Sequence, residues 1–273
     1  MLTPAKLNLY LKVERKRPDG FHDISSVFVP FSRVSDTVEL SAGEPGIALH
    51  CNLKELETPA NLVVRAADAY AQRSGIAPAW KFRLEKRIPI AAGMGGGSSD
   101  AAAVLRLLNE KYRKLPPERL AALAAEIGSD VPYFLNQVPA LVSGRGEKIE
   151  LLPELPVPPV VTVFPGFPVS AKWAYQHLAP ARLGPGDPAP LLEAMWRRDW
   201  ETAAAAMTND LEYALLAKFP LLGMIAASMR EAGGLKPQVT GSGSALFTIC
   251  RTDDAADELR AGLAAEYPEL TVI

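Results

Sequence analysis

The sequence predicts an α+β protein with two lobes, and three observations lead to that prediction. Segments with the two-residue alternation of a strand are interleaved with segments of helical spacing. At 273 residues, the chain exceeds the size that one hydrophobic core usually organises. Four prolines between residues 152 and 159 mark the expected boundary between lobes. We therefore predict one lobe over residues 1–155 and a second over residues 156–273.

The first lobe opens with a strand. Apolar residues at 7, 9, 11 and 13 alternate with polar ones, which predicts one buried face and an opposite face that carries Lys6 and Asn8. Residues 17–20 have the composition of a turn, and two further strands are expected over residues 27–31 and 37–40. A helix over residues 61–73 is predicted to stop at Gly75.

The middle of the chain predicts a strand, a glycine-rich loop and two helices. Residues 82–88 alternate apolar and charged side chains and end at Pro89. Residues 101–115 favour a helix with Ser98, Ser99 or Asp100 as its N-cap. A second helix opens at Pro116 and Pro117 and ends at Gly128.

The second lobe is predicted as two layers of strands and paired helices. We expect a buried strand over residues 160–164 and helices over residues 190–206 and 209–232. A strand over residues 239–247, a helix over residues 253–267 and a closing strand over residues 270–273 follow.

Charge and cysteine usage exclude several classes of protein. A net charge of −2 gives no overall attraction for nucleic acid or an anionic membrane. The two cysteines, Cys51 and Cys250, have no metal-ligand spacing and suit reduced thiols, so we expect no metal bound by the protein itself. No targeting segment or long apolar run is present in the sequence. We expect a soluble, cytoplasmic protein without nucleic-acid or membrane partners.

The glycine-rich loop points to phosphate binding. Successive glycines let the backbone approach an anion, and the positive end of the following helix favours negative charge there. A Walker A motif is excluded because no lysine lies between Ala91 and Leu105, and a dinucleotide fingerprint fails because Ser98 or Asp100 stands where its third glycine is needed. A flexible linker remains the alternative interpretation of this loop.

Three other features allow two interpretations each. Asp130 follows a helix-ending glycine among apolar residues, so it is either a cap for the next turn or a buried carboxylate that needs a partner. Lys6 is either a solvated strand residue or a functional cation. The segment 240–244 is either a hairpin turn or a place where backbone approaches a ligand.

Taken together, these segments resemble the GHMP small-molecule kinases. Residues 89–99 match the phosphate loop of that superfamily, and residues 240–244 match its C-terminal glycine motif. Residues 4–9, 17–22 and 128–134 resemble, within it, the 4-diphosphocytidyl-2-C-methyl-D-erythritol kinase family. The resemblance implies a two-lobed GHMP kinase fold, with an N-terminal lobe like a small ribosomal protein, a ferredoxin-like C-terminal lobe and the active site in the cleft between them.

The resemblance also implies the catalytic and nucleotide-binding residues. Asp130 matches the catalytic base, and Lys6 matches the lysine that orients the acceptor hydroxyl and offsets developing charge. ATP is expected to bind with Mg²⁺ that the nucleotide brings. Asn61 is expected near the adenosine. The residues expected to hold the ATP phosphates are Pro89, Ile90, Ala91, Ala92, Gly93, Met94, Gly95, Gly96, Gly97, Ser98 and Ser99.

The implied substrate is the cytidine diphosphate derivative of methylerythritol, phosphorylated on its 2-hydroxyl in the non-mevalonate route to isopentenyl diphosphate. His22 matches the residue that hydrogen-bonds the cytosine edge. The other residues expected to bind this substrate are Asn8, Phe21, Tyr175, Gly241, Ser242 and Gly243.

Two positions depart from the family pattern. Phe21 stands where tyrosine is frequent, so it keeps a stacking face and lacks the hydroxyl. Ala171 stands where threonine is common, and Ser170 is a candidate replacement for that contact.

Other functions stay open at the level of sequence. One is a different GHMP kinase, of the homoserine or mevalonate type. Another is a non-catalytic relative that binds a nucleotide or RNA. We expect a monomer or weak homodimer.

Overall fold

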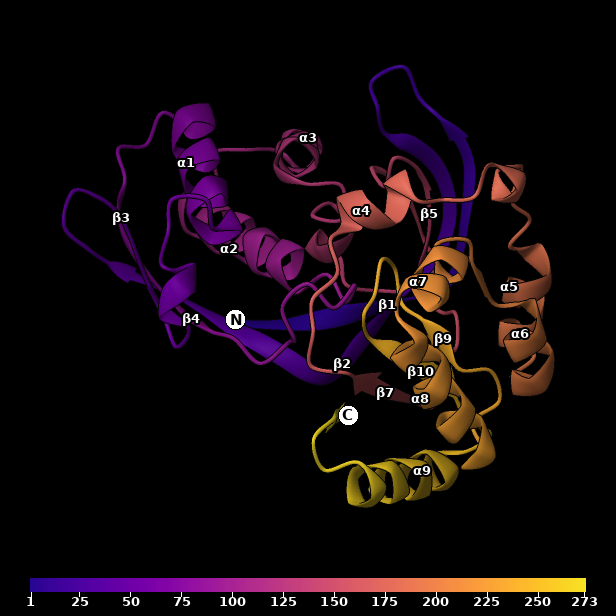
Figure 1. Ribbon diagram of the computed structural model, residues 1–273. Coiled ribbons are helices and arrows are strands. Elements are labelled where there is room, and N and C mark those ends of the chain that lie inside the picture. The colour runs from indigo at the N-terminus through magenta and orange to yellow at the C-terminus, as the bar shows by residue number, and fades with distance from the viewer. The chain divides into compact units, whose positions relative to one another are not determined.

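The structure is a computed structural model that describes all 273 residues and divides into two compact units. Unit 1 consists of Met1–Ala5, Phe31–Ile90 and Gly95–Gln137. Unit 2 consists of Lys6–Pro30, Ala91–Met94 and Val138–Ile273. The ribbon in Figure 1 shows that each unit combines helices and strands. Because the chain passes between the units several times, neither unit is a single continuous segment.

Unit 1 contains strands with helices packed beside them. Its strands are the first residues of β1 (Leu2–Lys16), the second half of β2 (His22–Ala42), β3 (Gly46–Cys51) and β4 (Ala79–Glu85). Its helices are α1 (Leu62–Ser74), α2 (Gly96–Tyr112), α3 (Pro117–Ile127) and the short 3-10 turns Lys54–Leu56 and Tyr133–Leu135. β4 pairs antiparallel with β2 and parallel with β3. Helix α1 packs against α2, α3 and β3 (Figure 1).

The core of unit 1 follows the period of its elements. Trp80, Phe82 and Leu84 alternate along β4 with exposed residues and are all at most 1% exposed. Tyr70 on α1 is fully buried and lies edge-on to Trp80, with ring centroids 6.3 Å apart. Burial of these large apolar side chains is the main favourable contribution to packing the helices on the strands.

Unit 2 contains strand pairs built on β1 and β2 and a separate four-stranded sheet. β5 (Ala140–Gly144) pairs with the first half of β2 and with β6 (Lys148–Leu151), and β8 (Thr208–Asn209) pairs parallel with β1. The four-stranded sheet has the order β11 (Thr271–Val272), β7 (Val160–Phe164), β10 (Leu246–Ile249), β9 (Gln238–Val239).

Six helices complete unit 2. They are α4 (Ala171–Gln176), α5 (Ala189–Trp196), α6 (Trp200–Ala206), α7 (Glu212–Lys218), α8 (Pro220–Glu231) and α9 (Asp253–Glu266), with a 3-10 turn at Pro180–Arg182. Helix α8 packs on β10, and α9 packs on β7. Buried Leu222, Met229 and Leu259 from these two helices join Val163 and Leu246 of the sheet in one apolar cluster.

The α+β fold class and several elements are confirmed. Helix α1 has Asn61 as its N-cap and Gly75 as its C-cap, and Gly75 adopts the left-handed conformation with φ 73°. Helix α3 begins at Pro117 and ends before Gly128, and β7 has the expected bounds.

Several expected boundaries are wrong for identifiable physical reasons. The two strands expected over residues 27–31 and 37–40 are one continuous strand, β2. β4 ends at Glu85, three residues early. The helix expected over residues 209–232 is broken at Pro220, whose ring cannot continue a helix. The one expected over residues 190–206 is broken at Arg198, which has φ 56°.

Helix α2 differs most from its sequence prediction. It begins at Gly96 and ends at Tyr112, with Gly95 as its N-cap and no side-chain cap. Gly95 has φ 74°, a left-handed conformation that glycine adopts without steric cost. Ser98, Ser99 and Asp100 therefore lie inside the helix, and their expected capping role is wrong.

The predicted division at residue 155 cuts the chain once, whereas each compact unit combines several separate segments of the chain. Residues of β1, β2 and the glycine-rich loop contribute to both units. A division into domains over residues 1–155 and 156–273 stays a prediction.

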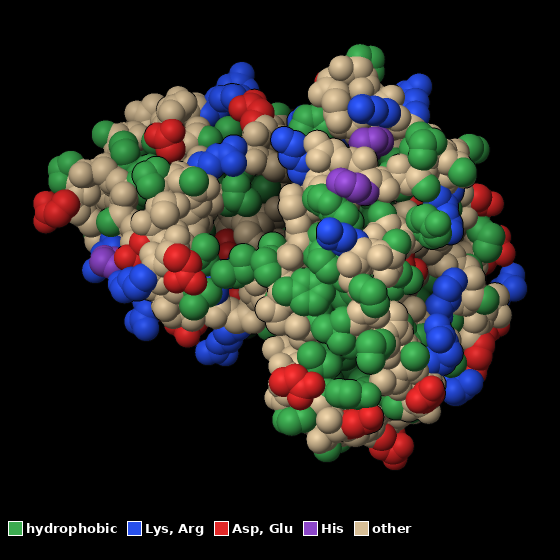
Figure 2. All heavy atoms as spheres, in the orientation of Figure 1, with side chains coloured by type: hydrophobic (Ala, Val, Ile, Leu, Met, Phe, Trp, Pro, Cys, Tyr) green, Lys and Arg blue, Asp and Glu red, His purple; other side chains and the backbone are tan.

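On the face shown in Figure 2, acidic and basic side chains are interspersed. No individual helix has the length and apolar character of a membrane span, and α7 and α8 reach them only as a pair bent by 109°.

The helix terminus at Gly75 gives a testable prediction. Gly75→Ala is expected to lower the free energy of unfolding by about 1 kcal/mol, because alanine is strained in the left-handed conformation although nothing lies within 4 Å of its Cβ. Gly223→Ala is the control, since Gly223 lies within α8 with equally open space and without a left-handed φ. It should raise stability by roughly 0.5–1 kcal/mol. Denaturant unfolding of both variants measures the difference, and equal effects would contradict the assignment.

Candidate active site

Lys6 is a buried cation in the interior of unit 2. Lys6 is 3% exposed, and its Nζ donates a hydrogen bond of 2.5 Å to Asn8 Oδ1. The same Nζ lies 4.8 Å from the centroid of the Phe28 ring. Its backbone N–H donates to Met94 O at 2.9 Å. Both faces of β1 are buried at this point, so the expectation of a single buried face and the interpretation of Lys6 as a solvated residue are both wrong.

Asn8 links β1 to the C-terminal glycine motif. Its backbone N–H donates to Thr240 Oγ1 at 3.1 Å, and its side-chain Nδ2 donates to Ser26 Oγ at 3.1 Å. Gln238 Nε2 donates to Asn8 O at 3.2 Å. The bonds with Thr240 and Gln238 join residues more than 200 positions apart in sequence, and together with Ser26 they fix the amide of Asn8 beside the Lys6 ammonium.

The two glycine motifs contact each other within unit 2. A Cβ atom on Gly93 would lie 2.1 Å from Thr240 O and 2.8 Å from Gly243 N, so only glycine fits there. A Cβ on Gly241 would lie 3.2 Å from Lys6 Nζ. Ala245 N also donates to Ala92 O at 3.1 Å. The segment 240–244 joins the antiparallel strands β9 and β10, and it is therefore both a hairpin turn and the partner of the glycine-rich loop.

The part of the loop that enters α2 belongs to unit 1. The first intrahelical bond runs from Ser99 N to Gly95 O at 2.9 Å, so the N–H groups of residues 96–98 have no acceptor within the helix. Ser99 Oγ is buried without a hydrogen-bond partner. Exposed amides, a helix amino-terminus and a spare hydroxyl are groups that bind phosphate oxygens. Because the loop leads into a regular helix and contacts a second glycine motif, the flexible-linker interpretation is wrong.

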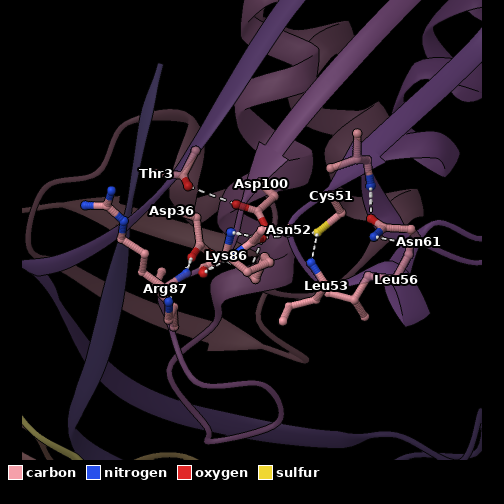
Figure 3. Close-up of polar contacts among 12 residues, drawn as sticks. Thr3, Asp36, Cys51, Asn52, Leu53, Leu56, Asn61, Lys86, Arg87 and Asp100 are labelled. Carbon is pink, nitrogen blue, oxygen red and sulfur yellow. Dashed lines mark hydrogen bonds and ion pairs between the residues drawn. The ribbon is translucent and has the colours of Figure 1, made fainter.

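Asn61 and Asp130 also lie in unit 1. The Asn61 side chain accepts a hydrogen bond from Val63 N and donates one to Leu56 O, each at 2.9 Å (Figure 3). Asp130 is half-buried, and the 3-10 turn Tyr133–Leu135 after it has Pro132 at its N-cap position and no side-chain cap. Burial and the nearby charge of Asp130 raise the pKa of Tyr133. Since Lys6 belongs to unit 2, its expected pairing with Asp130 stays a prediction.

The residues expected to hold cytidine come together in unit 2. The rings of His22 and Tyr175 are stacked, with centroids 5.3 Å apart and planes inclined by 22°. Phe21 is 48% exposed, and the guanidinium carbon of Arg145 lies 4.9 Å from its ring centroid. Burial and the positive charge of Lys16 lower the pKa of His22, which keeps its imidazole neutral near pH 7.

Ser170 is the candidate replacement for the threonine that is common in the family where this chain has Ala171. Ala171 is the first residue of α4, and Ser170 is its N-cap. The Ser170 hydroxyl accepts a hydrogen bond from Trp173 N at 3.4 Å. That oxygen already serves the helix, so a replacement contact to cytidine requires its remaining hydrogen-bonding capacity.

A buried charge cluster lies at both ends of the glycine-rich loop, and sequence reasoning missed it. Lys86 Nζ donates to Asp100 Oδ2 at 2.8 Å and forms an ion pair with Asp36 Oδ2, while Thr3 Oγ1 donates to Asp100 Oδ1 at 2.9 Å (Figure 3). Residues two apart on a strand share a face, and Asp36 lies two residues before Val38, which is fully buried. That shared period was the available signal that Asp36 faces the interior.

Comparison with known proteins decides the family. The 4-diphosphocytidyl-2-C-methyl-D-erythritol kinase of Solidesulfovibrio magneticus is 39% identical over 279 residues, covering 97% of this chain and 93% of that protein. The kinase of the same description from Geobacter sulfurreducens is 36% identical, with 93% and 90% covered. The chain belongs to this kinase family.

Domain and structure comparisons agree with membership of the 4-diphosphocytidyl-2-C-methyl-D-erythritol kinase family. Residues 61–144 match the GHMP kinases N terminal domain, and residues 191–269 match the GHMP kinases C terminal domain. A crystal structure of 4-(cytidine 5'-diphospho)-2C-methyl-D-erythritol kinase has a TM-score of 0.83 at 35% identity, covering 97% of this chain and 95% of that one. Homoserine kinase from Cytophaga hutchinsonii, at 17% identity and a TM-score of 0.74, shares the fold alone. The predicted GHMP kinase fold is confirmed.

The contact between the two glycine motifs gives a testable prediction. Gly93→Ala should lower the free energy of unfolding by about 2–3 kcal/mol, because its Cβ would overlap the backbone of Thr240 and Gly243. Gly166→Ala is the matched control in the same unit, since it has φ 86° and nothing within 4 Å. Its free energy of unfolding should fall by only about 1 kcal/mol, because of conformational strain. Denaturant unfolding compares them, and equal losses would show that the close approach does not contribute.

Proposed function

We propose that this chain transfers the γ-phosphoryl group of ATP to the 2-hydroxyl of 4-diphosphocytidyl-2-C-methyl-D-erythritol. The family relationship over almost the whole chain supports this substrate. The observation that carries the proposal is the burial of Lys6 beside Asn8 and the C-terminal glycine motif. A desolvated ammonium next to a phosphate-binding backbone suits stabilisation of charge in phosphoryl transfer. The reaction belongs to the non-mevalonate route to isopentenyl diphosphate.

ATP is the phosphoryl donor in this proposal, with its phosphates over residues 89–99. The amides at the start of α2 and the buried Ser99 hydroxyl supply donors for phosphate oxygens. The chain has no group of three acidic, histidine or cysteine side chains placed to hold a metal ion. We therefore assign Mg²⁺ to the nucleotide phosphates, whose charge it neutralises when bound. Asn61 at the start of α1 is assigned to the adenosine side of the nucleotide.

Lys6 and Asp130 are assigned the chemical roles. Phosphoryl transfer has a loose transition state, so positioning the hydroxyl and stabilising charge matter more than early proton removal. Asp130 accepts the hydroxyl proton late in the reaction, and Lys6 orients the hydroxyl oxygen. Asn8 fixes the Lys6 ammonium through its 2.5 Å hydrogen bond and contacts substrate near the reacting end.

His22, Tyr175 and Phe21 are assigned to the cytidine end of the substrate. A neutral imidazole offers one donor and one acceptor, which complement the neighbouring acceptor and donor groups of the cytosine edge. The rings of Tyr175 and Phe21 provide stacking faces, and the Arg145 guanidinium supports Phe21 from one side. Gly241, Ser242 and Gly243 are assigned to substrate contacts beside Lys6. Dependence on Mg²⁺, a monomeric or weakly dimeric state, a cytoplasmic location and the absence of nucleic-acid and membrane partners stay predictions.

Substrate profiling tests the proposed reaction directly. ATP consumption should depend on the cytidine-bearing alcohol, with little turnover of homoserine or mevalonate. Turnover of homoserine or mevalonate in place of the cytidine-bearing alcohol would show that the proposed substrate is wrong. ATP binding without turnover of any of these alcohols would favour a non-catalytic relative.

The role of Asp130 is tested with Asp130→Asn. Turnover should fall by at least about a hundredfold, while ATP affinity and thermal stability stay near the original values, because the amide keeps the size of the carboxyl and cannot accept the proton. Asp68→Asn, at an exposed aspartate on α1 of the same unit, is the control and should retain full turnover. Unchanged turnover in Asp130→Asn would refute the assignment as base.

The role of His22 is tested by substitution and by pH. His22→Ala should raise KM for the cytidine substrate about tenfold with little change in KM for ATP, because one or two hydrogen bonds to the base are lost. Since the pKa of His22 lies below its ordinary value of 6.5, the neutral form predominates above that pH. The KM for the cytidine substrate should therefore change little between pH 8 and pH 7 and rise at lower pH, as the imidazole gains a proton.

The control for the His22 experiment is His50→Ala, at an exposed histidine in unit 1. It should leave both KM values and their pH profiles unchanged. A rise in KM for ATP alone in His22→Ala would contradict the cytidine assignment.

A further inference from the structure

Three charged side chains are buried together behind the glycine-rich loop. Asp36 is fully buried, Asp100 is 2% exposed, and the Lys86 side chain is 6% exposed. They come from β2, from the second turn of α2 and from the residue that follows β4. Burying charge is costly unless each charged atom is paired and hydrogen-bonded.

Every carboxylate oxygen in this cluster has a donor. Asp36 Oδ1 accepts from Arg87 N at 2.6 Å and Ile88 N at 2.8 Å, and its Oδ2 pairs with Lys86. Asp100 Oδ1 accepts from Thr3, and its Oδ2 accepts from Lys86. All four carboxylate oxygens are therefore satisfied, which favours one arrangement of this buried polar network.

The cluster fixes the residues at which the loop begins and ends. Asn52 accepts from Lys86 N at 2.8 Å and donates to Lys86 O at 3.0 Å, so the backbone of residues 86–88 is held by Asn52 and Asp36 together (Figure 3). Pro89 follows directly. At the other end, Asp100 comes directly after Ser99 and is tied to the same Lys86 ammonium. One cation therefore connects both ends of the segment 89–99.

Close packing supports the same conclusion. A Cβ atom on Gly96, the first residue of α2, would lie 3.2 Å from Lys86 Nζ and 3.0 Å from a methyl group of Ile88. The first turn of α2 therefore rests directly on the cluster. A glycine-rich segment loses much conformational entropy when it is ordered, so anchors at both ends favour a formed loop before ligand arrives.

The charges also affect what the loop can bind. Two carboxylates so close to the start of α2 would repel an anion held by its amides. Burial alone would lower the pKa of Lys86, but the charges of Asp100 and Asp36 outweigh it and raise the pKa, so the ammonium remains charged at neutral pH. The ammonium of Lys86 offsets those carboxylates.

We propose that Lys86, held between Asp36 and Asp100, is a positioning residue that fixes both ends of the phosphate loop and offsets the two carboxylates behind it, so that the loop accepts triphosphate. This proposal rests on the proposed function, because it takes ATP as the ligand of the loop. Lys86 acts through the loop and not by contact with the reacting atoms. Its loss should therefore alter nucleotide affinity and leave recognition of the alcohol intact.

The test compares the binding of the non-hydrolysable ATP analogue AMP-PNP with Mg²⁺, by calorimetry, in a set of charge variants. Lys86→Met should weaken affinity about tenfold or more, since it leaves two buried carboxylates near the anion. KM for the cytidine alcohol should change less than about twofold. Lys81→Met, at an exposed lysine on β4, is the matched control and should bind as the unaltered protein does.

Charge rescue separates this role from a purely structural one. Lys86→Met combined with Asp100→Asn should regain most of the lost affinity, although the double variant has no more native hydrogen bonds than the single one. Asp100→Asn alone, which removes one negative charge and is nearly isosteric, should bind the analogue about two- to fivefold more tightly. It keeps the test decisive if Lys86→Met fails to fold.

The outcomes distinguish the two levels of the proposal. If the unaltered protein does not bind AMP-PNP, the proposed function fails and this inference fails with it. If the unaltered protein binds and Lys86→Met binds equally well, the role of Lys86 is wrong while the proposed function stands. Absence of rescue in the double variant, or no gain of affinity in Asp100→Asn, would likewise overturn the electrostatic role.

Discussion

The hydrogen bonds from β1 to two glycine motifs are the constraint on which the candidate site depends. Lys6 donates its backbone N–H to Met94 O, and two residues later Asn8 donates its backbone N–H to Thr240 Oγ1. These bonds occupy backbone groups that a buried strand must satisfy, and they bring three distant segments together. The Lys6 side chain is consequently enclosed in the interior and directed beside Asn8 and Gly241. A cation is tolerated there because its position and its partners are fixed by backbone geometry.

The second glycine motif is itself held by side chains that belong to the body of unit 2. Asn209 Nδ2 donates to Val239 O and Gly241 O, each at 2.8 Å, and Gln238 Nε2 reaches the backbone of β1. Asn209 thus supplies donors to two carbonyl groups of the segment 239–241, and Gln238 ties the same segment to the backbone of β1. These bonds hold the second glycine motif where it approaches Gly93 closely.

Local signals predicted the elements that local chemistry controls. Helix α1 was predictable because Asn61 and Gly75 have the side-chain and backbone properties of its two caps. The start of α2 was not, because serine and aspartate are good N-caps in isolation, whereas the left-handed Gly95 lets the helix begin earlier. Alternation predicted β1, but it could not show that both faces would be covered. That coverage depends on tertiary packing and decides the environment of Lys6.

The pairing of Asn8 with Thr240 has a consequence for biosynthesis. Thr240 follows Asn8 by 232 positions in the sequence, so the ribosome adds it long after it has added β1. Until then, the nascent β1 lacks the groups that enclose its ammonium. A polypeptide truncated before residue 240 would leave β1 without this cover, and its exposed apolar side chains and unpaired edge would favour aggregation. The interior around Lys6 is thus completed only after Thr240 has been added.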